Sequence, residues 1–278
     1  MGKLYDEVMN VIDFRLDESE ESLEEKVCNK EKKIMNILFW TNIIVLSFAI
    51  FCIIDEFPLG ALTFPFWITL SVMIIRHYQV KHQKRINVLM NDKGNFNSLL
   101  TVYLVRAKYH TISKKTSYVL LWNISSSLFY LGKTDEGKKV IDLIKRFCDT
   151  PEGNAQRLFY YAMEARIRMD KEGVKQCIEE LETIMPQIKK PYIIKTYDTI
   201  LKYPLSIEVE EKGDYAKALE LVKEDEKEGL FMKVSRNYRL YKVAKVAGMN
   251  QEAQGHRAFV IENGGDTMYS RELIDEKL

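Results

Sequence analysis

The sequence predicts an all-α protein in which a two-helix transmembrane hairpin is followed by an α-solenoid. Two uncharged apolar stretches, at residues 34–54 and 57–75, are each long enough to cross a bilayer hydrocarbon core of about 30 Å. Beyond the second stretch, apolar residues recur at intervals of three and four between short breaks, which is typical of successive amphipathic helices. We therefore expect a leader at 1–33, a hairpin at 34–80, a juxtamembrane linker at 81–95 and a repeat domain at 96–278.

The leader has the pattern of a short acidic amphipathic helix. Its apolar residues stand at helical spacing, at Leu4, Val8, Val11, Ile12 and Leu16. The acidic segment 17–21 follows, and anionic lipid headgroups repel such a segment. The leader is therefore expected to dock on the cytoplasmic domain or on a partner; the alternative is a solvated and partly mobile segment.

A membrane hairpin explains the two apolar stretches better than a pair of helices buried in a large soluble core. Helices of a soluble core usually keep a polar stripe, whereas the first stretch has only three polar breaks, Thr41, Asn42 and Ser47. The second stretch is the weaker candidate, because Pro58 and Pro65 interrupt its first half and shorten the continuous helix. Residues 66–80 complete this crossing if Arg76 extends to the membrane surface.

The charges that flank the two stretches predict the orientation of the hairpin. Basic residues stand on the outer sides of both stretches, at Lys30, Lys32, Lys33, Arg76, Lys81, Lys84 and Arg85. The linking turn, residues 55–60, has neither lysine nor arginine. Because positive residues stay on the inner side of a membrane, we expect a multi-pass protein of the cell membrane with both termini in the cytoplasm. Its richness in Lys, Ile and Asn favours a bacterial inner membrane.

Charge balance and cysteine placement argue against several classes of function. The 41 Lys and Arg residues nearly match the 40 Asp and Glu residues, so no basic surplus favours a nucleic-acid partner. The four cysteines, Cys28, Cys52, Cys148 and Cys177, are scattered and have no histidine at metal-ligand spacing. We expect reduced thiols, no metal site and no cofactor. No nucleophile is paired with a base in the sequence, so we do not expect an enzyme.

The region 96–278 divides into helix pairs joined by tight turns near Gly132, Asp170, Gly213 and Gly248. Pairs that recur every roughly thirty to forty residues are typical of a solenoid. The clearest unit, residues 213–221, resembles the turn and second-helix start of a tetratricopeptide repeat, with Gly213 in the turn and small Ala218 between the helices. The resemblance covers about two-thirds of the chain and implies a curved helical superhelix; another array of helical hairpins is the alternative.

The resemblance also implies where a ligand would bind. In tetratricopeptide repeats, the residue after the first buried position of each leading helix tends to face the concave groove in which peptides bind. Four aromatic residues stand at those positions, Trp122, Phe159, Tyr203 and Tyr238. Positive charge comes from Arg166, Lys242 and Lys245. The groove would then carry an aromatic ladder for an extended peptide or a helix; a register error of one residue would place these aromatics in the core instead.

These features predict a membrane-anchored adaptor or scaffold that binds a cytoplasmic protein or peptide in a concave groove. Confinement to the lipid bilayer raises the effective concentration of the groove toward other membrane components, so we also expect association with a membrane complex. The alternative is a self-immunity or transport-accessory protein that acts through its hairpin. In that case Asn42 would form a hydrogen bond to another membrane helix.

Overall fold

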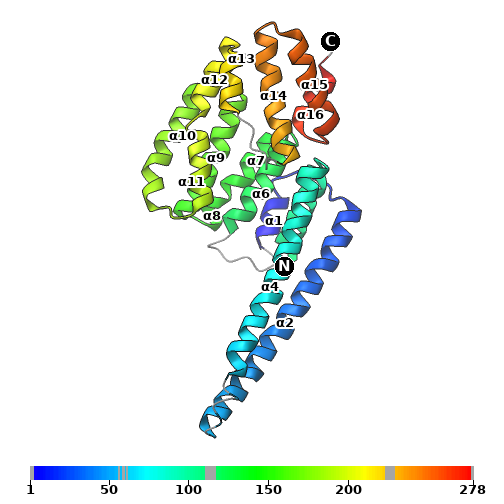
Figure 1. The fold of residues 1–278 in the computed structure, drawn as a ribbon, viewed down its shortest axis with the longest axis vertical. Helices are drawn as coiled ribbons and strands as arrows, with labels where there is room; N and C mark the ends of the chain where they lie inside the picture. The colour runs from blue at the N-terminus through cyan, green and yellow to red at the C-terminus, as the bar shows by residue number, and fades with distance from the viewer. Residues whose placement is uncertain are drawn as a thin grey trace.

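The computed structural model describes residues 3–55, 57, 60, 62–109, 117–222 and 229–276. Among these residues there are helices and connecting segments but no β-strand, so the predicted all-α class is confirmed. The molecule is elongated. Two long antiparallel helices, α2 (Glu18–Ile54) and α4 (Thr63–Asn87), project from a body of shorter helices (Figure 1).

The other helical elements pack at one end of this pair. In chain order they are α1 (Lys3–Met9), the π-helix η1 (Val88–Asp92), α5 (Phe96–Tyr109), α6 (Ser117–Tyr130), α7 (Thr134–Asp142), α8 (Ile144–Phe147), α9 (Pro151–Ile167), α10 (Lys171–Ile184), the 3-10 helix η2 (Met185–Gln187), α11 (Pro191–Ile200), α12 (Tyr203–Lys212), α13 (Tyr215–Leu221), α14 (Leu230–Val246), α15 (Asn250–Asn263) and α16 (Met268–Asp275).

Of the described helices, α2 alone is long and apolar enough to cross a membrane. Its apolar part, residues 34–54, extends about 31 Å at a rise of 1.5 Å per residue. Only 17% of its most apolar window is buried in the protein, whereas the core helix of a soluble protein is mostly buried. Its exposed side chains include Ile37, Phe39, Trp40, Ile44, Phe48, Phe51 and Ile54.

Helix α4 is shorter in its apolar part, so the described part of the chain has one candidate membrane span where two were predicted. The apolar part of α4 begins at Thr63 and ends at Ile75, before Arg76. It extends about 20 Å, against about 30 Å for the hydrocarbon core. Residues 56, 58, 59 and 61 of the predicted linking turn and second stretch lie outside the described residues. The two helices are nevertheless paired, and Ser71 Oγ of α4 donates a hydrogen bond to Asn42 Oδ1 of α2 at 3.3 Å.

Two predicted region boundaries fall inside continuous helices. The border between leader and hairpin at residue 33 lies within α2, which begins at Glu18. The helix begins there because the carboxylate of Asp17 accepts hydrogen bonds from the main-chain N–H groups of Ser19 and Glu20, at 3.0 and 3.2 Å. The predicted linker at 81–95 is largely helical, since α4 runs to Asn87 and η1 follows it.

Helix α1 of the leader packs on the body, as its amphipathic spacing predicts. Leu4, Val8 and Ile12 are buried in the main hydrophobic core. On the outer side, Glu7 forms an ion pair with Arg146 of α8 at 2.8 Å. The leader is therefore part of the folded body in the structure.

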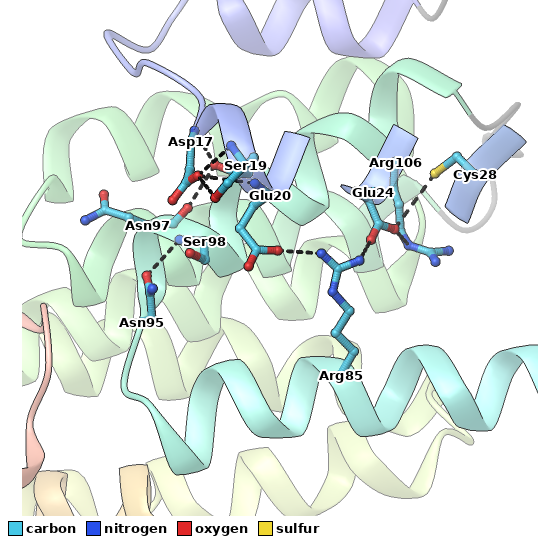
Figure 2. Close-up of polar contacts among 11 residues, drawn as sticks. Asp17, Ser19, Glu20, Glu24, Cys28, Arg85, Asn95, Asn97, Ser98 and Arg106 are labelled. Atoms are coloured by element: carbon cyan, nitrogen blue, oxygen red, sulfur yellow. Dashed lines mark hydrogen bonds and ion pairs between the residues drawn. The ribbon is translucent and has the colours of Figure 1, made fainter. Parts of the chain in front are cut away.

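The base of the helix pair is held by a buried carboxylate, Glu24 of α2, which is fully buried (Figure 2). Two guanidinium groups from different helices neutralise it. Arg85 of α4 donates to one oxygen, and Arg106 of α5 lies 2.8 Å from the other. Arg85 also bonds Glu20, one turn earlier on α2. Because a buried carboxylate is stable only when its charge is compensated, these ion pairs fix the helix pair to α5 of the body.

Four helical hairpins, α6/α7, α9/α10, α12/α13 and α14/α15, occur at the four predicted turns. Each turn has one residue in the left-handed conformation, Gly132, Met169, Gly213 or Gly248, with φ between 59° and 76°. The hydrogen bonds also repeat. In the third turn, Gly213 N–H donates to Glu210 O and Asp214 N–H donates to Val209 O, the Schellman pattern that ends a helix.

The last helices return to the first ones. Phe231 of α14 packs against Phe96 of α5 and Tyr130 of α6, with ring centroids 4.9 and 4.6 Å apart. In an open solenoid each pair contacts only its neighbours. Here the chain closes on itself, so that helices from the beginning and the end of the body share one core.

Candidate functional site

A pocket of about 190 Å³ lies among the leading helices of the four hairpins. Helix α14 supplies the largest part of its wall, and α6, α9 and α12 supply most of the remainder. Its lining combines aromatic, methionine and charged side chains, among them Tyr130, Met163, Arg166, Tyr203, Glu210, Phe231, Met232, Tyr238, Arg239, Lys242 and Tyr269. The pocket is therefore lined by residues from the leading helices of all four hairpins.

Four of the residues predicted from the sequence line this pocket: Arg166, Tyr203, Tyr238 and Lys242. The other three, Trp122, Phe159 and Lys245, do not, and Lys245 instead forms an ion pair with Glu276. Phe159 is buried in a second core, and half-buried Trp122 packs edge-on against it with ring centroids 6.5 Å apart. Thus, of the four aromatic residues predicted to line one groove, Tyr203 and Tyr238 line the pocket and Trp122 and Phe159 do not. Phe159 faces the helices packed on α9, so its burial stabilises the body and leaves no surface for a ligand.

Arg166 joins two of the pocket helices and is itself nine-tenths buried. Its Nη2 donates hydrogen bonds to Glu210 Oε2 at 2.6 Å and to Ser206 Oγ at 2.9 Å, both on α12. Its Nη1 lies 3.3 Å from Met169 Sδ in the hairpin turn. Its Nε is buried without a hydrogen-bond partner in the described part of the chain. Arg166 therefore links α9 to α12, and its Nε–H donor has no hydrogen-bond acceptor in the described part of the chain.

Glu272 of α16 binds two of the three predicted residues on α14, Tyr238 and Lys242. Its two carboxylate oxygens accept from Tyr238 Oη at 2.5 Å and from Lys242 Nζ at 2.6 Å. Burial raises the pKa of the Tyr238 phenol, and the hydrogen bond to Glu272 raises it further. The phenol thus stays protonated, and the charge of Lys242 is matched by a carboxylate.

The sequence reasoning missed Tyr130, Phe231, Arg239 and Tyr269. The rings of Tyr130 and Tyr269 lie 6.2 Å apart, and Tyr269 lies 4.6 Å from Tyr238. For α14 a signal existed, because Phe231, Tyr238 and Lys242 recur at the spacing of one helix face. For Tyr130 and Tyr269 no local signal existed, since closure of the body brings these distant segments together.

Arg239 has no ion-pair partner among the residues that the structure describes. Its side chain is half-buried at the pocket wall. Burial raises the pKa values of Tyr130 and Tyr269, and the positive charge of Arg239 acts on both in the opposite direction. The guanidinium is therefore close to two protonated phenols, and no carboxylate of the described residues neutralises it.

No group of three or more His, Cys, Asp and Glu side chains that could hold a metal ion occurs in the described ranges. The four cysteines are buried free thiols there. Burial raises the pKa of Cys28 to about 12 and of Cys177 to about 11, which keeps both thiols protonated.

Comparison with models of protein families, with curated proteins and with solved structures found no match for this chain.

Proposed function

We propose that this protein is a membrane-anchored adaptor that captures a segment of a cytoplasmic protein in the pocket among its leading helices. The observation that carries the proposal is the combination of an exposed apolar helix with a mixed aromatic and charged pocket in the helical body. The helix localises the molecule, and the pocket supplies the binding surface.

The anchor in this proposal is the pair α2 and α4, inserted together as a two-span hairpin with both termini in the cytoplasm. The apolar side chains of α2 face outward, as do Phe66, Val72 and Met73 of α4. An apolar surface of this extent is unfavourable in water and favourable in hydrocarbon. The basic residues at the base of both helices set the orientation.

The body in this proposal is a tetratricopeptide-like array. The support is the recurrence of one turn geometry in four successive hairpins, together with the position of the pocket on their leading helices. Met232 is half exposed at the pocket, and methionine side chains adapt to partners of different shape. A short segment with an apolar side chain would pack there.

The alternative, action through the hairpin alone, has weaker support. It depends on Asn42 as a hydrogen-bonding residue for a foreign helix. The side-chain oxygen of Asn42, Oδ1, already accepts a hydrogen bond from Ser71 Oγ within the helix pair. This contact supplies a simple structural role for Asn42, namely fixing the register of α2 against α4.

Site-specific photocrosslinking in cells tests the adaptor. A benzophenone amino acid replaces Met232 at the pocket in one variant and Leu219 of α13 in a matched control, since both side chains are about half exposed. We expect one dominant cytoplasmic protein to crosslink from position 232, not from position 219, and to disappear when Tyr203→Ala is added. Identical crosslinks from both positions would refute capture at the pocket.

Carbonate extraction and topology reporters test the anchor separately. The protein should remain in the membrane pellet at alkaline pH, and reporters at both termini should be accessible from the cytoplasm. A single span would place the two termini on opposite sides, and release into the supernatant would exclude a membrane-spanning anchor altogether.

A further inference from the structure

We infer that the pocket recognises an oxyanion, a carboxylate or phosphate group, and that Arg239 is the residue that binds it. The source of the anion, a captured protein segment, rests on the proposed function. The affinity of the pocket for the anion does not.

Of the three cations that line the pocket, one has no ion-pair partner among the described residues. Arg166 is neutralised by Glu210 at 2.6 Å, and Lys242 by Glu272 at 2.6 Å. Arg239 forms no ion pair with any residue in the described ranges. A half-buried guanidinium without a counter-charge is unfavourable, and an incoming oxyanion removes that cost. Arginine is also suited to this role because its planar donors can bind two oxygens of one group.

The polar groups around Arg239 are chiefly donors. Burial raises the pKa values of Tyr130 and Tyr269, so both phenols keep their protons at neutral pH. Arg166 adds a buried Nε that has no hydrogen-bond partner in the described part of the chain. The carboxylate of Glu210 is already engaged by Arg166. A cavity with unused donors and an occupied acceptor favours a ligand that brings acceptors, and an oxyanion brings several.

The size and the walls of the pocket restrict what carries the anion. A volume of about 190 Å³ is below the roughly 300 to 1,000 Å³ of sites for drug-sized ligands. It accommodates one side chain. Phe129, Phe231 and Met163 provide apolar wall beside the charged residues. The geometry thus fits an acidic or phosphorylated side chain with apolar neighbours, presented by a protein segment.

Calorimetric titration of the full-length protein in a non-ionic detergent tests this inference. The first pair of probes is an amidated peptide with one glutamate between leucines and the same peptide with glutamine. The second pair is inorganic phosphate and glutarate, which report the anion alone. The variants are Arg239→Gln and the matched control Arg146→Gln, which removes an exposed cation on α8.

We expect the wild type to bind the glutamate peptide about ten-fold more tightly than the glutamine peptide, a difference of about 1.4 kcal/mol. Arg239→Gln should abolish this preference, and Arg146→Gln should preserve it. Because Arg239 forms no ion pair with a described residue, the melting temperature of Arg239→Gln should be at least that of the wild type, which would show that the fold is intact.

The remaining outcomes are also decisive. If neither peptide binds but phosphate or glutarate binds and Arg239→Gln prevents it, the pocket takes a free small anion. Binding that survives Arg239→Gln, or that Arg146→Gln weakens equally, contradicts the inference, as does a wild type that binds no probe. If a partner crosslinks at position 232 but every titration is negative, the proposed adaptor function is supported and the inference that the pocket recognises an oxyanion is refuted.

Discussion

The carboxylate of Asp266 caps the helix that begins at Phe96. Its oxygens accept hydrogen bonds from the main-chain N–H groups of Phe96 at 2.7 Å and of Asn97 at 2.8 Å. Asp266 N–H in turn donates to Gly94 O at 3.1 Å. The loop before α16 thereby closes on the start of α5, and closure fixes Tyr269 beside Tyr130 at the pocket.

Replacing Asp266 with alanine should lower the free energy of unfolding by about 1 to 2 kcal/mol, because it removes a helix cap and leaves two N–H groups unpaired. Urea denaturation followed by circular dichroism measures this loss. Asp275→Ala, at an exposed position on α16, is the control and should have little effect. Equal effects of the two substitutions would show that the cap contributes nothing specific.

Two turn glycines should differ in their tolerance of alanine. Gly213 and Gly248 both have positive φ, so alanine costs about 1 kcal/mol at either position. A Cβ atom at Gly213 would also lie 2.9 Å from Ala247 N, whereas no atom lies within 4 Å of a Cβ at Gly248. Gly213→Ala should therefore lower the unfolding free energy by at least about 1 kcal/mol more than Gly248→Ala in the same denaturation experiment. A larger loss in Gly248→Ala would refute the contact argument.

Substitution of Glu24 should be severe. Glu24→Gln leaves the guanidinium groups of Arg85 and Arg106 without their shared counter-charge, and breaking a buried ion pair costs about 3 to 5 kcal/mol. Urea denaturation should show this loss, and limited proteolysis should show earlier cleavage near the base of α2. Glu20→Gln, which removes only a partly exposed contact with Arg85, should have a smaller effect.

His256 should make the stability dependent on pH. Its Nε2 lies 2.7 Å from Tyr215 Oη and its Nδ1 lies 2.7 Å from Asn237 Oδ1. Burial lowers the pKa of His256 below its ordinary value of 6.5, although Glu252 acts in the opposite direction. The unfolded chain therefore binds a proton more readily than the folded chain.

The neutral imidazole consequently contributes stability that is present above about pH 6.5 and is lost as the pH falls through the lowered folded pKa. Unfolding free energies measured from pH 8 to pH 5 should decline more steeply for the wild type than for His256→Gln. Parallel curves for the two proteins would refute this assignment.

Local patterns in the sequence predicted the elements that depend on local forces. The apolar run at 34–54 predicted the exposed part of α2, and the breaks near Gly132, Gly213 and Gly248 predicted three of the four turns at their left-handed residues. Such features follow from side-chain hydrophobicity and backbone sterics within a few residues. The second turn differs only in that Met169, one residue before Asp170, takes the left-handed position.

Which side chains meet depends on how distant helices pack. Phe159 and Tyr203 occupied equivalent positions in the sequence register, yet one lies in a core and the other lines the pocket. Glu24 stands in an acidic run that resembles a solvated surface, and its burial depends on arginines of two other helices. The helices, the apolar span and the turns follow from short stretches of sequence, because the interactions that stabilise them are local. The closed body, the pocket and the place of Arg239 in its wall depend on the packing of distant helices, because those contacts join segments that no local preference relates.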